Sequence, residues 1–223
     1  MKNKLAVFLT ALIVSFSSSA MAFEGFSLGA SYSSIDYSTT GKERTNGATL
    51  TSSVISADKT VKGTADKGSI FAEYTFSQGS TIGIDYVEGS AEIGKASRSS
   101  STPSGTVTAK ATAKNPITLY AEPTYMFTPK FGVYVKGGVT EITVSPSETD
   151  TANVTTSTYK DKDLYGRMMG AGAKFYVGNF FVKGEYTETD FATYSHISTT
   201  GEGNTITADI DTKETRIAIG YNF

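Results

Sequence analysis

The last nine residues of the chain, T-R-I-A-I-G-Y-N-F, alternate strictly between large apolar side chains and small or polar ones. The large members are Ile217, Ile219, Tyr221 and Phe223. A period of two is the pattern of a β-strand whose two faces meet different surroundings. Because chain ends usually fray, a strand that keeps this pattern to its final residue is expected to be held by a neighbouring strand.

The same alternation recurs along the chain, and no segment from residue 23 onward shows a sustained helical period. The composition agrees, because 22 Gly, 13 Tyr and 13 Phe beside only 5 Pro and no Trp favour strands and turns over helices. The sequence therefore predicts an all-β chain with eight strands. Their expected positions are residues 26–37, 68–76, 80–92, 116–127, 130–144, 164–177, 180–194 and 209–223.

The first 22 residues have the layout of a secretory signal peptide. Lys2 and Lys4 form a positive start, residues 5–16 are apolar, and Ala20-Met21-Ala22 is a small-x-small cleavage site. The apolar stretch is shorter than the roughly 20 residues that span a bilayer. We therefore expect residues 1–22 to be a cleaved signal peptide and residues 23–223 to form one exported domain.

Charge and composition exclude several classes of function for the mature chain. Removal of Lys2 and Lys4 leaves 18 of the 20 basic side chains against 22 acidic ones, a formal charge of −4 without a basic patch. This balance argues against binding of nucleic acid. With no Cys and one His, disulfides and thiolate metal sites are excluded, and most zinc or general-base chemistry is too. We expect no metal, no cofactor and no catalytic residue.

The connections between the predicted strands alternate between two lengths. Residues 77–79, 128–129 and 178–179 are tight turns, whereas residues 38–67, 93–115, 145–163 and 195–208 are long connections rich in Ser, Thr, Gly, Lys and Asp. Short turns at one end and long polar loops at the other are typical of an outer-membrane barrel. The sequence predicts an eight-stranded antiparallel up-and-down transmembrane β-barrel with periplasmic turns and extracellular loops. We expect residues 23–223 to form this one barrel domain in the outer membrane of a Gram-negative cell.

A soluble sandwich or a lipocalin-like barrel would show the same alternation of apolar residues, so these residues alone do not distinguish the classes. The residues at the alternate positions of each strand, which we call the polar parity, do distinguish them. Charges of both signs recur at mid-strand, interleaved with glycines and tyrosines. That mixture suits a narrow lumen filled by ion pairs better than a solvated outer face. The predicted lumen charge network is Glu73, Asp85, Glu122, Lys136, Lys174, Lys183, Glu185 and Arg216.

Aromatic side chains gather where the predicted turns lie, as in the periplasmic girdle of a membrane barrel. These residues are Phe76, Phe127, Phe131, Phe175, Phe180, Tyr221 and Phe223. The closing strand must pair with the first, because lipid tolerates no open sheet edge. Its ending, with Ile219, Tyr221 and Phe223 on one face, resembles the C-terminal signature by which outer-membrane proteins are presented to the barrel-assembly machinery.

The segments G-A-G-A-K-F-Y (residues 170–176), F-V-K-G-E-Y-T-E-T-D-F (residues 181–191) and I-G-Y-N-F resemble the small eight-stranded outer-membrane barrel family. That family includes the transmembrane domain of outer membrane protein A, outer membrane protein X and the opacity-type proteins. The resemblance implies a monomer in contact with outer-membrane lipid and lipopolysaccharide. In that family the strand that corresponds to residues 181–191 often carries an arginine and a glutamate that face the lumen. Here Lys183 replaces the arginine, so the two parallel hydrogen bonds that a guanidinium can form with a carboxylate are lost.

Architecture does not decide function, because this fold hosts structural proteins, adhesins, pores and lipid-modifying enzymes. We expect a non-enzymatic barrel with a structural or adhesion-like role, in which the Ser/Thr-rich loops contact a host or phage surface ligand. A small pore through the lumen is the alternative. A lipid A hydrolase is a third hypothesis, because His196 and Ser198 resemble residues of the outer-membrane deacylases. Thr199 stands where that family has asparagine, and no glutamate sits at a matching place.

Overall fold

The computed structural model describes residues 24–46, 53–55, 59–101, 104–150, 158–198 and 205–223. The predicted signal peptide, residues 1–22, lies outside these ranges. Within them, no helix is long and apolar enough to cross a membrane.

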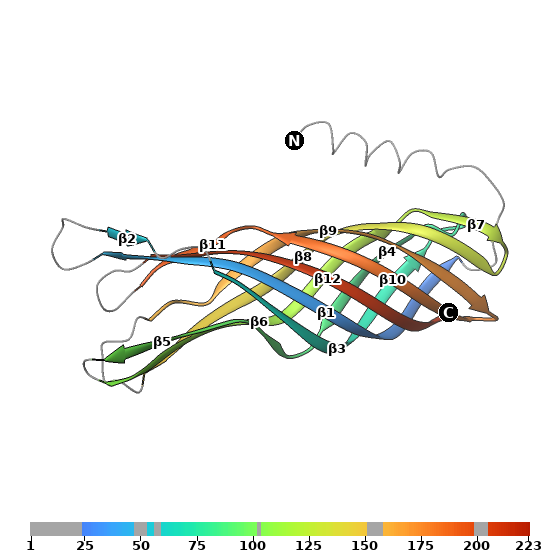
Figure 1. Ribbon diagram of the computed structural model, residues 1–223. Coiled ribbons are helices and arrows are strands. Elements are labelled where there is room, and N and C mark those ends of the chain that lie inside the picture. The colour runs from blue at the N-terminus through green and yellow to red at the C-terminus, as the bar shows by residue number, and fades with distance from the viewer. Residues whose placement is uncertain (1–23, 47–52, 56–58, 102–103, 151–157, 199–204) are drawn as a thin grey trace, which may run out of the picture.

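Eight strands form a closed antiparallel ring in which each pairs with its neighbours in the chain (Figure 1). The ring closes where β1 and β12 pair from Ser27 opposite Asn222 to Arg44 opposite Thr205. This ring confirms the predicted eight-stranded barrel. Its strands are β1 (Gly25–Asn46), β3 (Lys59–Thr75), β4 (Thr81–Val87), β6 (Ser104–Glu122), β8 (Phe131–Asp150), β9 (Lys162–Val177), β10 (Phe180–Phe191) and β12 (Thr205–Asn222).

Four further strands pair with members of the ring. They are β2 (Ser53–Ile55) on β1, β5 (Ser90–Ser101) on β6, β7 (Thr124–Thr128) on β8 and β11 (Tyr194–Ile197) on β12. In Figure 1, β2 and β5 lie at one end of the barrel, which we call the hairpin end, and β7 lies at the other. The three predicted tight turns join strands at that opposite end, which we call the turn end. The chain also finishes there, with the amide of Phe223 donating to the carbonyl of Phe26 at 2.9 Å.

Toward the hairpin end, the strands run farther than the sequence predicted. β1 continues to Asn46 and β6 begins at Ser104, inside segments expected to be loops. The predicted strand over residues 80–92 was wrong as one element, because it breaks into β4 and β5 around Gly89, whose φ of 96° suits glycine. Frequent Thr and Ser hid the extensions, since polar side chains on both faces mask the alternation while backbone pairing continues.

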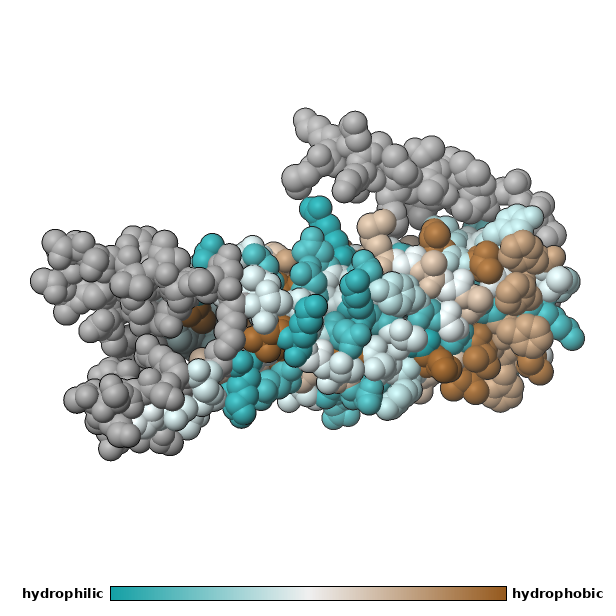
Figure 2. Space-filling view, viewed as in Figure 1, coloured by the Kyte–Doolittle hydropathy of each residue, from teal (hydrophilic) through white to brown (hydrophobic). Residues whose placement is uncertain are grey.

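An apolar band surrounds the outer wall of the ring near the turn end. The outward side chains are well exposed in the isolated chain, as for Leu119 at 66% and Val135 at 51%. The brown side chains in Figure 2 gather at this end, and teal ones cover the wall farther along. Edge-on aromatic contacts form part of the band, with Phe180 5.0 Å from Tyr221 and Tyr221 5.1 Å from Phe223 between ring centroids. This is the girdle expected of a barrel in lipid.

Candidate functional site in the barrel lumen

The lumen is layered along the barrel axis, and the inward side chains of β10 show the order. From the turn end they are Phe181, Lys183, Glu185, Thr187, Thr189 and Phe191, all buried. An aromatic floor is thus followed by a charged layer, a threonine layer and an apolar layer. A filled interior of this kind is typical of eight-stranded barrels.

Glu122 is the centre of the charged layer. Its carboxylate lies 2.8 Å from Nζ of Lys183, 3.3 Å from Nζ of Lys136 and 3.7 Å from Nζ of Lys174. All four side chains are at most 2% exposed. One buried carboxylate therefore joins three lysines that come from β8, β9 and β10. Lys174 also donates to the hydroxyl of Thr81 at 2.9 Å, which connects the network to β4.

A second centre extends the layer toward the hairpin end. The guanidinium of Arg216 donates from both terminal nitrogens to Asp85, at 2.9 and 3.1 Å. Lys136 donates to Glu185 at 2.5 Å, and Lys183 forms an ion pair with Glu73. The structure therefore brings all eight predicted lumen charges into one cluster. The bidentate pair of arginine and carboxylate that Lys183 does not form is therefore formed by Arg216 and Asp85, with Arg216 on the adjacent strand β12.

Two tyrosines that the polar parity placed in the lumen, Tyr120 and Tyr134, lie within the network, although the predicted set named only its charges. The hydroxyl of Tyr120 donates to Glu73 at 2.6 Å, and Nζ of Lys136 lies 3.9 Å from the centroid of the Tyr120 ring. Inward glycines make room for the rings, because a Cβ on Gly83 would sit 2.6 Å from Tyr120 and one on Gly172 would sit 2.5 Å from the hydroxyl of Tyr134. Glycine alternating with tyrosine on the polar parity was the available signal.

A hydrophobic core fills the lumen at the hairpin end, and sequence reasoning missed it. Its buried residues are Ile35, Tyr37, Ala91, Ile93, Ala113, Ile142, Val144, Leu164, Phe191, Tyr194 and Ile210. Ile93 is the first residue of a segment that the sequence predicts to be a loop, and Ile142 lies near the end of the predicted strand over residues 130–144.

Strand β5 contributes to this core because it departs from the ring. Its backbone ladder is with β6, and side chains hold its other edge to the wall. The hydroxyl of Thr39 donates to the carbonyl of Ile93 at 2.7 Å, and Nζ of Lys67 donates to the carbonyl of Ser90 at 2.6 Å. These two bonds lie between the hairpin of β5 and β6 and strands β1 and β3, so they hold the hairpin against the mouth of the lumen.

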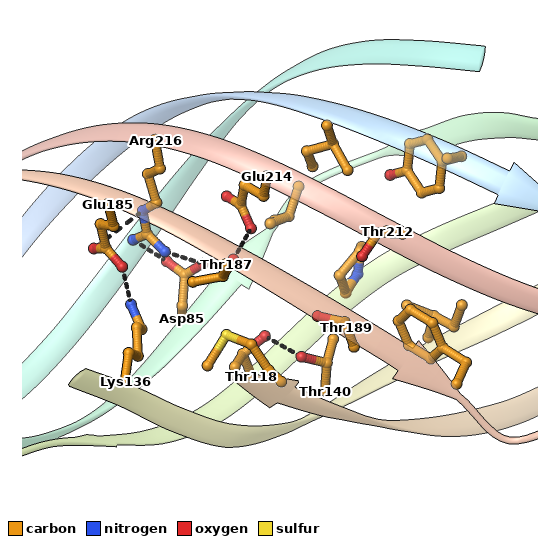
Figure 3. Close-up of a pocket in the computed structure, with 17 residues that line it drawn as sticks. Asp85, Thr118, Lys136, Thr140, Glu185, Thr187, Thr189, Thr212, Glu214 and Arg216 are labelled. Carbon is orange, nitrogen blue, oxygen red and sulfur yellow. Dashed lines mark hydrogen bonds and ion pairs between the residues drawn. The ribbon is translucent and has the colours of Figure 1, made fainter. Parts of the chain in front are cut away.

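Between the charged layer and the apolar core lies a cavity of about 50 Å³ (Figure 3). Arg216 and Glu185 lie at one side of it, and its wall includes Thr118 and Thr140, whose hydroxyls are 2.9 Å apart. Among the described residues, Oε1 of Glu185 and Nε of Arg216 have no hydrogen-bond partner, although they lie 4.0 Å apart. A cavity of this size and polarity holds a few water molecules rather than a continuous aqueous path.

The structure does not assemble a hydrolase site at His196 and Ser198. Nδ1 of His196 contacts the carbonyl of Ile197 at 2.6 Å, and the hydroxyl of Ser198 donates to the carbonyl of Thr158 at 3.4 Å. The His196 ring packs against Tyr194 and Tyr159, with centroids 6.4 and 6.5 Å away. Both of these hydrogen-bonding contacts are with backbone carbonyls. The absence of enzymatic activity stays a prediction.

The residues of the predicted assembly signal lie on the outer wall. Ile219, Tyr221 and Phe223 face outward at the turn end, and Ile219 and Tyr221 lie opposite Ala30 and Leu28 of β1. The segment is therefore both the closing strand of the ring and part of the aromatic girdle. Recognition by the assembly machinery stays a prediction.

Comparison with known proteins agrees with this architecture. OprG of Pseudomonas aeruginosa matches with a TM-score of 0.57 and 14% identity, over 92% of this chain and 99% of that one. Neisserial surface protein A matches with a TM-score of 0.45 and 12% identity, over 87% and 99% of the two chains. AlkL matches with a TM-score of 0.42 and 14% identity, over 93% and 95%. At 14% identity, the match to OprG shows the fold alone.

No curated protein matches the sequence. The family model described as the outer membrane protein beta-barrel domain matches residues 6–223, which is nearly the whole chain. The resemblance to small outer-membrane barrels is thereby confirmed, and so is the outer membrane as the location. The chain belongs to the outer membrane protein beta-barrel domain family.

Proposed function

We propose that this protein is a non-conducting outer-membrane barrel that holds rigid β-hairpins above the membrane for contact with other surfaces. The observation that carries the proposal is the hydrophobic core at the hairpin end. It lies beyond the apolar band of the outer wall, where the strands have left the lipid. A core in that place stabilises the hairpins themselves, since the lipid-embedded part of the barrel is already closed.

Rigidity distinguishes these hairpins from a mobile hydrophilic cover. β1 and β12 stay paired out to Arg44 and Thr205, and β6 and β8 stay paired out to Val107 and Asp150. Ordered strands present side chains in fixed positions, which lowers the entropic cost of binding a partner. An adhesion-like role is therefore better supported than a purely structural one.

The layered lumen argues against the alternative of a small pore. Ion pairs around Glu122 fill one layer and the apolar core fills another, with a cavity of about 50 Å³ between them. We expect the folded protein to show no discrete conductance steps in planar lipid bilayers. Reproducible steps that survive repurification, and that change when Glu122 is replaced by Gln, would sink the non-conducting assignment.

Shortening the hairpin of β5 and β6 tests the surface role. Ser97 and Thr108 face each other across the ladder, with hydroxyls 3.0 Å apart. Replacing residues 98–107 by Asn-Gly would close the hairpin in a two-residue turn at that pair. We expect cells that display this variant to lose most of their retention on cultured epithelial cells and immobilised glycans, because the presented tip is gone.

Heat-modifiable gel migration and surface labelling serve as the folding and export controls for this variant. The matched control keeps the full hairpin length and reverses the order of residues 98–101, which retains composition and charge. A fully folded shortened variant that adheres like the unaltered protein would argue against a surface role for this hairpin.

A further inference from the structure

Glu214 brings into the lumen a negative charge that the predicted charge network did not include. It lies on the inward parity of β12, between the buried residues Thr212 and Arg216. The eight members of the lumen charge network already comprise four carboxylates and four cations. Among the described residues, Glu214 forms no ion pair, and its neighbour Arg216 is engaged by Asp85 through both terminal nitrogens. Glu214 therefore leaves the lumen with one negative charge in excess.

Hydrogen bonds satisfy only part of the Glu214 carboxylate. The hydroxyl of Ser33 donates to one of its oxygens at 2.5 Å, whereas the hydroxyl of Thr187 lies 3.5 Å from the other. A contact of that length is at the limit of a hydrogen bond, so the second oxygen keeps most of its capacity to bind another group. Two neutral hydroxyls also do not replace a counter-ion for a charge that is partly withdrawn from water.

Glu185 offers a second carboxylate oxygen to the same cavity (Figure 3). Its Oε2 accepts from Lys136, but its Oε1 accepts no hydrogen bond within the described part of the chain. The Glu185 side chain is 1% exposed, so bulk water does not reach this oxygen. A buried carboxylate oxygen without a partner, next to a cavity, indicates that a group inside the cavity binds it.

The wall of this cavity is negative and rich in oxygen atoms. Its charged residues are Asp85, Glu185, Glu214, Lys136 and Arg216, which give three carboxylates against two cations. Threonine hydroxyls complete the polar lining, from Thr118, Thr140, Thr187, Thr189 and Thr212. Carboxylate, hydroxyl and water oxygens are the ligands that hard cations prefer. The cavity therefore has both the charge and the ligand atoms to hold a small cation.

The number of carboxylates favours a monovalent ion over a divalent one. Among the described residues, no three Asp, Glu, His or Cys side chains are grouped so that they could hold a metal ion. One uncompensated charge is matched by one monovalent cation, for which neutral hydroxyls and water complete the coordination. The prediction that the chain has no metal rested on the lack of Cys and on a single His, which does not bear on a cation bound by oxygen.

We propose that the lumen cavity binds one monovalent cation, such as Na⁺, through the carboxylates of Glu185 and Glu214. Threonine hydroxyls and one or more water molecules complete its coordination. The ion neutralises the excess charge of Glu214 and occupies the free oxygen of Glu185. The charged layer and the hydrophobic core close the cavity on its two sides, so the ion is a fixed part of the folded barrel. This inference does not rest on the proposed surface role.

The test measures urea-induced unfolding in phosphatidylcholine vesicles while NaCl replaces N-methylglucamine chloride at constant ionic strength. Each protein is refolded in the salt in which it is measured, so entry of the ion does not limit binding. Because only the folded barrel holds the ion, the unfolding equilibrium constant should fall about tenfold for each tenfold rise in Na⁺ above the dissociation constant. Glu214→Gln should remove this dependence. In N-methylglucamine alone, Glu214→Gln should unfold at a higher urea concentration than the unaltered protein, because its lumen carries no excess charge.

Glu188→Gln is the matched control, because Glu188 lies on β10 like Glu185 but is 57% exposed on the outer wall. It should keep the full Na⁺ dependence. An unaltered protein that ignores Na⁺ and K⁺ would show that water alone fills the cavity and would overturn the proposal. Equal Na⁺ dependence in Glu214→Gln, or stabilisation by Ca²⁺ alone, would overturn it too.

Crystals grown with Tl⁺ in place of Na⁺ give a second readout that does not depend on stability. An anomalous scattering peak should lie in the cavity of the unaltered protein and be absent from Glu214→Gln. A cavity without this peak in the unaltered protein would contradict the proposal. The shortened hairpin keeps Glu185 and Glu214, so adhesion and cation binding can fail independently.

Discussion

Replacing Lys183 by Met is expected to lower the free energy of unfolding of the barrel by about 3–5 kcal/mol. The methionine fills much of the same volume but leaves Glu73 without an ion-pair partner and removes the shortest contact of Glu122 with a lysine. Both carboxylates are at most 2% exposed, so water does not replace the lost cation. Urea-induced unfolding in lipid vesicles, followed by heat-modifiable migration and tyrosine fluorescence, measures the change.

An exposed pair of the same chemistry is the control. Lys213 and Glu188 are 3.4 Å apart, with side chains 63% and 57% exposed. Lys213→Met should leave the unfolding midpoint unchanged, because solvent screens that pair. Equal midpoints for the Lys183→Met and unaltered proteins would show that the lumen charges relax without cost, and the network would lose its assigned structural role.

Replacing Val135 by Arg is expected to destabilise the barrel by about 2–4 kcal/mol in bilayers. Val135 lies on the outward parity of β8, between the inward residues Tyr134 and Lys136, and belongs to the middle of the apolar band. An arginine there must bring its charge into hydrocarbon or bend toward the interface. The free energy of unfolding from urea titrations in phosphatidylcholine vesicles gives the size of the effect.

Thr149→Arg on the same strand provides the comparison, because Thr149 is exposed and lies beyond the band at the hairpin end. It should unfold like the unaltered barrel. If Val135→Arg were as stable as Thr149→Arg, the wall around Val135 would not face lipid, and the assignment of the two faces of β8 would have to be reversed.

The barrel was predictable from the sequence because lipid and lumen impose a period of two on every strand. The parity that placed Glu73, Lys136 and Lys183 inside required only the alternation, so the membership of the lumen cluster followed from it. Ion-pair partners did not follow. Which lysines approach Glu122 depends on strand register and stagger around the ring, and no local pattern encodes that.

The hairpin end was harder to predict for a different reason. Outside the membrane both faces of the sheet meet water until a core forms. The strands there therefore carry Ser and Thr on both faces. Ile93 and Tyr194 are isolated apolar residues in such segments, and only the folded ring brings them together. The hydrolase hypothesis rests on the local spacing of His196 and Ser198, whereas the contacts of these side chains with the carbonyls of Ile197 and Thr158 depend on the folded chain.

The hydrophobic core at the hairpin end gives the two halves of each strand different thermodynamics. Near the turn end, the strands associate within lipid, and their outward side chains pass from contact with lipid to contact with lipid and neighbouring strands. Expulsion of water therefore contributes little to the free energy of that association. At the hairpin end, assembly removes apolar surface from water, which carries a large heat-capacity change. The same strands cross both regions without a break. Temperature should therefore alter the stability of the hairpins far more steeply than that of the embedded ring, and fraying should begin above the membrane.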